Sequence, residues 1–274
     1  APPDTGLLIP KTEDGRVLFV LPWEGHALVG TTDEPAEVEA HPRPSKEDIA
    51  YLLRHIGRYF DLTVAESDIK AAWSGLRPLI FDPKATDTAR LTRDHLIDQS
   101  PSGLITIAGG KWTTYRKMAL DVVNLAVRKF SLKPKTGCRT EGIYLMGGEG
   151  YDPAGDAGLV VEYGLDARVA THLNRAYGDR AEAVARIAAD GYGAFLAKGH
   201  PYVEAEVLYG VRHECAEHAM DVLAHRTALA QLDTAAAGEA SGRVIDLMGG
   251  EMKWDEDRVR KERHMVTERL SSSL

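Results

Sequence analysis

The first third of the chain alternates short apolar runs with turn residues, and this pattern predicts β-structure. Residues 15–32, GRVLFVLPWEGHALVGTT, place two apolar runs on either side of the turn-prone WEGH, so we expect an antiparallel hairpin there. Further strands are expected at Ile69–Leu76, Leu91–Gln99 and Leu104–Ala108. This part of the chain therefore has a mixed character, with strands and intervening helices.

Two helices are predicted among these strands. Ser45 with Asp48 three residues later resembles a capping box, which marks a helix N-terminus. The residues on one face of this helix are apolar: Ile49, Leu52, Leu53, Ile56 and Phe60. A second helix follows the strand at 104–108, with apolar residues at helical spacing: Met118, Ala119, Val122, Val123, Ala126 and Val127.

The pattern changes near residue 131, where SLKPKTGCRT reads as a linker. Most of the chain beyond it has helical periodicity, bounded by Gly, Pro and Asp. The expected helices are Leu159–Tyr177, Ala181–Asp190, Tyr202–Leu229, Ser241–Met248 and Asp255–Leu270. We therefore expect two domains, a mixed one at 1–130 and an all-α one at 131–274.

Composition excludes several classes of protein. The chain is 44% hydrophobic and 27% charged, as in ordinary globular proteins, and its net charge of −8 gives no reason to expect a nucleic-acid partner. No apolar run approaches the roughly 18 residues of a membrane span, and the first residues lack a signal or transit pattern. Cys138 and Cys215 do not resemble a disulfide framework, which favours a reducing compartment.

Metal and nucleotide motifs fail on spacing. In HECAEH, His213 and His218 are five residues apart, whereas the zinc-protease motif needs two histidines four apart. A solvated helix face with one buried cysteine is the better interpretation, and no metal site is expected. The glycines of 147–150 and of 191–193 do not complete G-x-G-x-x-G, so we interpret both stretches as turns.

Two arginines lie in otherwise apolar segments. Arg77, in WSGLRPLIFD, precedes Pro78, which favours an extended backbone. If its guanidinium is buried, it must pair with an anion, and a structural carboxylate or an anionic ligand satisfies this equally well. Arg93, in LTRDHLID, is next to Asp94; taken alone, this motif is better explained as a local salt bridge.

The segment LITIAGGKWTTYR, residues 104–116, predicts a strand that turns at once into a helix. A helix N-terminus has unpaired N–H groups and a partial positive charge, so it suits a phosphate or any group that becomes anionic. Gly109 and Gly110 allow close approach to the backbone, and Lys111 adds a full charge. The alternative is a strand–helix junction with a solvent-facing lysine.

Seven segments occur together and in order across nearly the whole chain. They are GRVLFVLPWEGHALVGTTDEP, AAWSGLRPLIFDP, LTRDHLID, GLITIAGGKWTTYRKMA, LNRAYGDRA, PYVEAEVLYGVRHECAEHAMDVLAHRTALAQLD and RVIDLMGGEMKWD. In this ordered set the chain resembles the C-terminal half of the FAD-dependent glycerol-3-phosphate dehydrogenases, particularly the mitochondrial type.

The resemblance implies a fold. The family has a glutathione-reductase-like FAD domain interleaved with a β-rich substrate domain, followed by an α-helical C-terminal domain. Residues 1 to about 100 would be the end of the substrate domain, and Leu104 to about Phe130 the last strand and helix of the FAD domain. The remainder would be the helical domain, so the expected class is α+β followed by all-α.

The resemblance also implies a site. By position, Arg77 and Arg93 match two arginines at the substrate, and Lys111 matches a lysine beside flavin and substrate. The residues expected to contact the isoalloxazine are Gly109, Gly110, Lys111, Trp112 and Thr113. His95 is a candidate general base for the C2 hydroxyl, although a core position for its side chain is the preferred interpretation.

The reaction implied is oxidation of sn-glycerol 3-phosphate to dihydroxyacetone phosphate, with electrons passing through FAD to ubiquinone. The substrate is a dianion, and the planar fork of arginine suits phosphate oxygens. Hydride transfer leaves negative charge at the pyrimidine end of the flavin, which Lys111 and the helix starting near Thr113 would stabilise. The implied location is peripheral, at the mitochondrial inner membrane, within the respiratory chain.

The chain also departs from the family. Its enzymes are longer, and their first half contains the G-x-G-x-x-G that binds the ADP part of FAD. We therefore expect another chain to supply that half and this chain to be inactive alone. The alternative is a non-catalytic structural or interaction subunit derived from the enzyme, in a respiratory-chain assembly. A flavin dehydrogenase with another substrate is disfavoured by the two arginines, which suit a phosphate ester. Near Ala224–Leu232 the family's basic and aromatic character is reduced.

Overall fold

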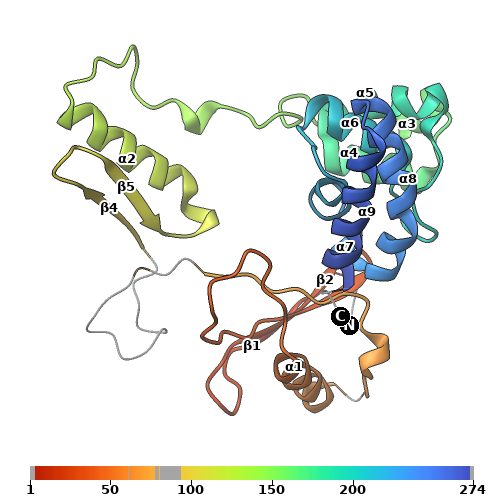
Figure 1. Ribbon diagram of the computed structural model, residues 1–274, viewed down its shortest axis with the longest axis horizontal. Coiled ribbons are helices and arrows are strands. Elements are labelled where there is room, and N and C mark those ends of the chain that lie inside the picture. The colour runs from red at the N-terminus through yellow and green to blue at the C-terminus, as the bar shows by residue number, and fades with distance from the viewer. Residues whose placement is uncertain (1–3, 61, 78–79, 81–93, 272–274) are drawn as a thin grey trace. The chain divides into compact units, whose positions relative to one another are not determined.

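The chain divides into two compact units in the computed structural model (Figure 1). The structure describes residues 4–60, 62–77, 80 and 94–271. The first unit comprises residues 1–34, 39–75 and 146–274, and the second comprises residues 35–38 and 76–145. Each unit has its own secondary structure and packing.

The first unit begins with a three-stranded antiparallel sheet. Its strands are β1 (Leu7–Ile9), β2 (Leu18–Trp23) and β3 (His26–Gly30), in that spatial order. Trp23 pairs with His26, which leaves Glu24 and Gly25 as a two-residue turn with φ values of 48° and 78°. Two positive φ values are typical of the turn that best matches strand twist. The hairpin expected at 15–32 is confirmed.

Helix α1 (Lys46–Tyr59) follows and starts where the capping pattern predicts. The Ser45 hydroxyl oxygen accepts a hydrogen bond from the Asp48 N–H at 3.0 Å. The expected apolar face is only half-buried in the structure, and Tyr51 and His55 are the buried residues of α1. The Tyr51 side chain packs with the sheet core and donates a hydrogen bond to Asp14 at 2.8 Å, so an amphipathic aromatic takes the inner position.

The prediction of a strand at Ile69–Leu76 is wrong. This segment follows a short helix, η1 (Glu66–Asp68), and has no strand pairing. Its backbone finds another partner, because the Lys70 carbonyl accepts a hydrogen bond from the Thr234 N–H at 2.9 Å. Trp73 lies against Trp23, with ring centroids 6.0 Å apart. The apolar residues of this segment therefore contact other elements without forming a ladder.

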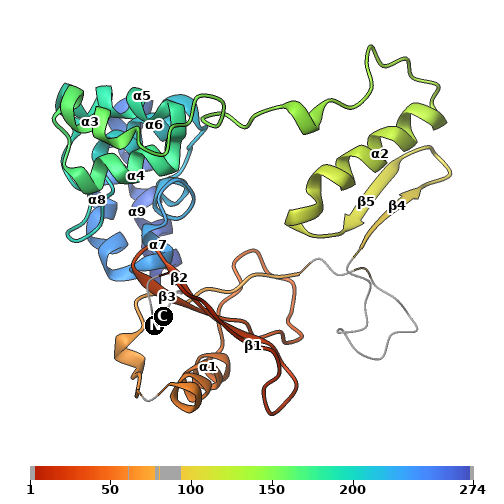
Figure 2. The ribbon, with the colours of Figure 1, turned by 180° about the vertical axis from the view of Figure 1, so that it is seen from behind.

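Helices make up the rest of the first unit. They are α3 (Asp156–Tyr163), α4 (Ala167–Tyr177), η5 (Gly178–Arg180), α5 (Ala181–Ile187), η6 (Ala188–Tyr192), α6 (Glu204–His213), η7 (Asp221–Arg226), α7 (Leu229–Leu232), α8 (Thr234–Met252) and α9 (Glu256–Ser271). Figures 1 and 2 show α3 to α9 gathered in one bundle. One core cluster joins α3 to α6 and another joins α6 to α9, so α6 contributes to both.

Two of the expected helices are interrupted. The one predicted at 159–177 breaks at Gly164, which has φ of 65°, and α4 starts anew after Asp166, whose carboxylate caps the Arg168 N–H. The one predicted at 202–229 ends at His213, shortly before Cys215, which has φ of 55°. Left-handed residues end helices, but a cysteine does not reveal this conformation in the sequence. The expectation of a buried cysteine in HECAEH is wrong, because Cys215 lies exposed beyond the end of the helix.

The second unit contains a two-stranded antiparallel sheet and one long helix. The strands are β4 (His95–Gln99) and β5 (Ile105–Gly109), and the helix is α2 (Tyr115–Lys129), preceded by η3 (Trp112–Thr114). Another short helix, η4 (Thr140–Gly142), lies further along. The strand expected at 104–108 is confirmed to within one residue. The strand expected from Leu91 starts at His95, and residues 91–93 lie outside the described part.

Candidate functional site

The glycine pair at the end of β5 adopts backbone conformations that favour glycine. Gly109 and Gly110 have φ values of 74° and 79°. A Cβ at Gly109 would lie 2.9 Å from the Asp94 carbonyl oxygen, and a Cβ at Gly110 would collide with the Met118 sulfur. The backbone is therefore packed closely against β4 and α2, with no room for side chains on these two residues.

Lys111 begins the short helix η3 immediately after this pair. The Thr114 hydroxyl accepts a hydrogen bond from the Lys111 N–H at 3.2 Å and donates one to the Lys111 carbonyl at 3.0 Å. These bonds use the lysine backbone and leave its exposed side chain outside the turn. The next residue, Trp112, is 86% exposed, and its indole stacks on Tyr115 with a centroid distance of 5.5 Å. A lysine and an indole thus stand at the solvent surface beside a helix start.

His95 is directly opposite Gly109 in the β4–β5 ladder. Its Nε2 lies 3.0 Å from Asp121 Oδ2. The other carboxylate oxygen of Asp121 pairs with Lys117, and Asp121 and Lys117 both belong to α2. The pKa of Asp121 is lowered, chiefly by its hydrogen bond with Lys117 and further by His95. Partial burial of the carboxylate opposes this shift. The expectation that the His95 side chain points into the fold agrees with this contact. Sequence analysis missed Asp121, although its i,i+4 spacing from Lys117 was a readable signal.

The position of the predicted substrate arginines relative to Lys111 stays a prediction. Arg77 belongs to the second unit, in an irregular segment, and its side chain is exposed, whereas its apolar neighbours suggested burial. Arg93 lies outside the described residues. The choice between a structural carboxylate and an anionic ligand for Arg77 therefore stays a prediction.

Helix α2 is apolar on one side but has no buried residue. Its Val123 is 57% exposed, and Leu96 of β4 is 50% exposed. Leu96 alternates along β4 with the half-buried His95 and Ile97, so it lies on the sheet face opposite to the one from which His95 contacts α2. The second unit, taken by itself, thus has an uncovered face.

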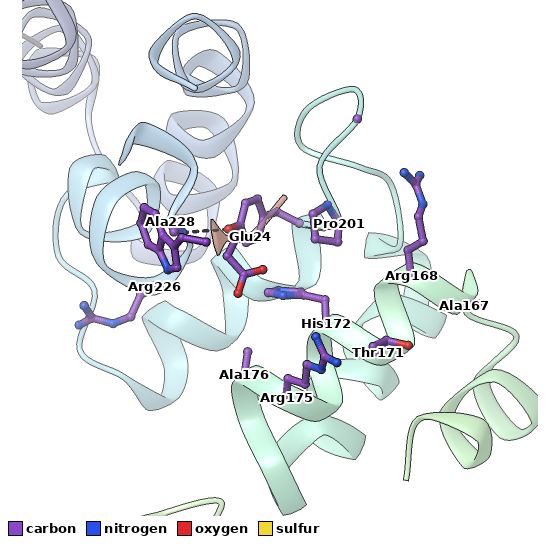
Figure 3. Close-up of a pocket in the computed structure, with 13 residues that line it drawn as sticks. Glu24, Ala167, Arg168, Thr171, His172, Arg175, Ala176, Pro201, Arg226 and Ala228 are labelled. Atoms are coloured by element: carbon purple, nitrogen blue, oxygen red, sulfur yellow. Dashed lines mark hydrogen bonds between the residues drawn. The ribbon is translucent and has the colours of Figure 1, made fainter. Parts of the chain in front are cut away.

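The first unit contains a cavity of about 610 Å³ between the β2–β3 turn and the helices (Figure 3). Arg168, Thr171, His172 and Arg175 line it from one face of α4, at i, i+3, i+4 and i+7. In Figure 3 the Glu24 carboxylate points toward the ring of His172. The cavity is therefore lined by charges of both signs.

His172 is the most constrained titratable group of this cavity. Its Nε2 lies 2.8 Å from the buried Glu206 carboxylate, which also accepts hydrogen bonds from Tyr177 Oη at 3.1 Å and from the Val203 N–H at 2.8 Å. Burial lowers the pKa of His172, but the hydrogen bond and charge of Glu206, with a smaller contribution from Glu24, raise it above its ordinary value overall. The same carboxylate and burial raise the pKa of Tyr177. Sequence analysis missed this network, because Tyr177 and His172 are 29 and 34 residues from Glu206 in the sequence.

Two other classes of site find no support in the part of the chain that the structure describes. Within it, no three His, Cys, Asp or Glu side chains gather where they could hold a metal ion. No helix of that part combines the length and apolar character needed to cross a membrane.

Two family models match the chain. The model described as "FAD dependent oxidoreductase" matches residues 1–116, and that described as "C-terminal domain of alpha-glycerophosphate oxidase" matches residues 138–259. The residues between these two matches include most of α2 and the larger part of the predicted linker.

Curated relatives are mitochondrial glycerol-3-phosphate dehydrogenases. The chain is 47% identical over 277 residues to the protein of Bos taurus, covering 98% of this chain and 38% of the relative. It is 47% identical to that of Homo sapiens, covering 93% and 36%, and 41% identical to glycerol-3-phosphate dehydrogenase SDP6 of Arabidopsis thaliana, covering 99% and 46%. The chain thus spans less than half the length of these relatives.

A solved structure is also similar. The crystal structure of glycerol-3-phosphate dehydrogenase from Bacillus halodurans complexed with FAD matches with a TM-score of 0.80 and 26% identity. The match covers 98% of this chain and 53% of that one.

Proposed function

The chain belongs to the FAD-dependent glycerol-3-phosphate dehydrogenases, and from this premise we propose that it forms the C-terminal part of an enzyme that oxidises sn-glycerol 3-phosphate to dihydroxyacetone phosphate. The family's cofactor is FAD. We propose that electrons leave the flavin for ubiquinone.

The observation that carries the proposal is the close-packed glycine pair followed by Lys111 and a helix start. Atoms of the chain fill the space where a Cβ of Gly109 or Gly110 would be, so in this proposal a planar ring approaches the backbone from its opposite face. The residues present therefore fit the pyrimidine end of a flavin. They are Gly109, Gly110, Lys111, Trp112 and Thr113. FAD, when bound, accepts the hydride of the alcohol.

In this proposal, positively charged residues of this chain bind the flavin ring and the phosphate of the substrate. The exposed Lys111 and the N–H groups of the first turn stabilise negative charge at the flavin ring. Arg77 and Arg93 hold the phosphate dianion, because guanidinium groups match phosphate oxygens with paired N–H donors.

We further propose that residues 1–130 complete the substrate and FAD domains and that residues 131–274 form the helical domain. The two family models support this division, because the first ends at residue 116 and the second begins at residue 138. The nucleotide-binding part of the enzyme lies on polypeptide outside these 274 residues. The exposed apolar residues of α2 and β4 support such a covering segment.

The proposed location is peripheral, at the mitochondrial inner membrane, in the respiratory chain. The names of the relatives from Bos taurus and Homo sapiens support a mitochondrial protein.

The test is to purify the native protein through a tag on this chain and record its visible absorption anaerobically. We expect flavin bands that bleach when glycerol 3-phosphate is added and remain when glycerol 2-phosphate, its positional isomer, is added. Bands that do not respond to glycerol 3-phosphate would contradict the proposed activity. A protein without any flavin would favour the non-catalytic subunit instead.

A further inference from the structure

The glycine pair of the proposed flavin site is located by contacts on two sides. On one side are β4 and Asp94 just before it, since His95 pairs with Gly109, and the Asp94 carbonyl oxygen together with the Ile80 side chain leaves no room for a Cβ on that glycine. On the other side is α2, whose Met118 side chain occupies the space next to Gly110. The path of this backbone therefore depends on how far apart β4 and α2 are.

One side-chain contact spans these two elements at this level. His95 of β4 donates its Nε2–H to Asp121 of α2, with an N···O distance of 3.0 Å. The His95 side chain is 19% exposed and that of Asp121 is 28% exposed, so solvent weakens this bond less than it would at the surface. The Cβ of His95 also faces Gly110, at 3.4 Å from where a Cβ on that residue would be.

A third group keeps the acceptor in place. Lys117, one turn before Asp121 on α2, pairs with the second carboxylate oxygen of Asp121. This contact orients the carboxylate and favours its anionic form, in which both oxygens accept hydrogen bonds. The Asp121 carboxylate thus accepts from His95 of β4 and from Lys117 of α2. Because both of its oxygens are held, the bond to His95 fixes the distance between α2 and β4.

We propose that His95 and Asp121 form a positioning pair, which holds α2 against β4 and thereby places the backbone of Gly109–Lys111 for the flavin. This inference rests on the proposed function, because it assumes that the flavin lies at this segment. His95 acts here through the backbone that it holds. It is not required to touch the substrate, and Asp121 stays ionised throughout.

The pair predicts an effect on the flavin that a purely structural bond would not have. If the backbone N–H groups and Lys111 move away from the ring, negative charge on the ring is stabilised less. A tenfold weaker preference for the reduced cofactor lowers the two-electron midpoint potential by about 30 mV.

The experiment uses the flavin-containing protein purified through a tag on this chain. The variants are His95→Leu, which removes the donor, Asp121→Ala, which removes the acceptor, and His95→Gln, whose amide N–H can replace Nε2–H. Asp98→Asn, at an exposed position of β4, is the matched control. Midpoint potential is measured by dye-coupled titration and thermal stability by differential scanning calorimetry.

We expect His95→Leu and Asp121→Ala to lower the potential by the equivalent of about tenfold or more, with bound flavin retained. We expect His95→Gln to restore most of the loss and Asp98→Asn to change nothing. A potential that stays at the wild-type value in His95→Leu and Asp121→Ala, while only thermal stability falls, would overturn the proposal.

A second readout separates this inference from the proposed function. Amide hydrogen exchange at residues 109–116 should rise in His95→Leu relative to wild type, with exchange in α4 unchanged. If the purified protein contains no flavin, the proposed function fails and the exchange result alone decides whether the pair holds this backbone. Unchanged exchange at 109–116 would contradict the pair in either case.

Discussion

At the scale of single residues, backbone conformation and close packing decide what each position tolerates. Gly110 combines a positive φ with a sulfur atom where a Cβ would be, whereas Gly137 in the same unit has neither constraint. Arg77 and Lys111 are both exposed, and both are proposed to contact a ligand. Substitutions at the two glycines test stability, and substitutions at the two charged residues test binding, so the two effects can be measured separately.

Replacement of Gly110 by alanine should destabilise the second unit. A left-handed alanine costs about 1–2 kcal/mol, and displacement of Met118 adds to this. The control, Gly137→Ala, has open space at its Cβ and should change stability by less than about 0.5 kcal/mol. Chemical denaturation of both variants checks this, and an equal effect of the two substitutions would contradict the strained geometry.

Replacement of Arg77 by alanine tests its proposed role at the phosphate. We expect kcat/KM for glycerol 3-phosphate to fall by the equivalent of about 2–5 kcal/mol, because a desolvated charge contact is lost. Arg128→Ala, at an exposed position of α2, is the control and should leave turnover unchanged. Steady-state kinetics with a quinone acceptor measures both, and wild-type kinetics for Arg77→Ala would make this arginine structural.

At the scale of elements, local signals were read correctly and distant partners were not. The β2–β3 hairpin and the start of α1 depend on turn and capping residues within a few positions, so the sequence alone predicts them. The segment at 69–76 was misread as a strand, because the partner of its Lys70 carbonyl is Thr234. The breaks after Tyr163 and His213 depend on left-handed residues, of which only Gly164 is recognisable from its type. The strand that ends at the glycine pair was predictable for the same reason as the hairpin, whereas the role of Gly109–Thr113 at a flavin stays a prediction.

Helix α9 is tied to the turn before η7 by one buried acid. Glu262 accepts hydrogen bonds from the Ala219 N–H at 3.0 Å and from Arg258 Nη2 at 2.9 Å, and His218 Nδ1 lies 2.7 Å away. Glu262→Ala should therefore cost about 2–3 kcal/mol of unfolding free energy. Glu256→Ala, on the same helix at a fully exposed position, should cost less than about 0.5 kcal/mol. Urea denaturation distinguishes them, and similar midpoints would argue against the buried bond.

The contact between α4 and α6 should depend on pH through His172. Glu206 raises the pKa of His172 in the folded state. The charge of His172 therefore stabilises the fold, and this contribution is complete at pH values below the unfolded pKa of about 6.5. This contribution is lost as pH rises through the raised folded value. Relative to His172→Gln, wild type should therefore be stabilised most at acidic pH, and the difference should shrink above neutrality. Melting temperatures of both proteins across this range measure it; a constant difference would show that the charge is irrelevant.

At the scale of the whole molecule, the two units differ in how complete they are. The helical bundle has two core clusters with fully buried residues such as Leu173 and Met248. The helix of the second unit has none, and the chain spans 38% of the relative from Bos taurus. The helices expected beyond residue 131 therefore have a core within the described residues, whereas the division into domains at 1–130 and 131–274 stays a prediction.

The central claim is that the flavin ring lies at residues 109–113. A cryo-electron microscopy or crystal structure of the flavin-containing protein, purified through this chain, tests it most directly. We expect density for the pyrimidine end of the ring within about 3 Å of backbone N–H groups in this segment, with Lys111 beside it. A flavin bound elsewhere, with Gly109 and Gly110 facing only protein, would contradict the account.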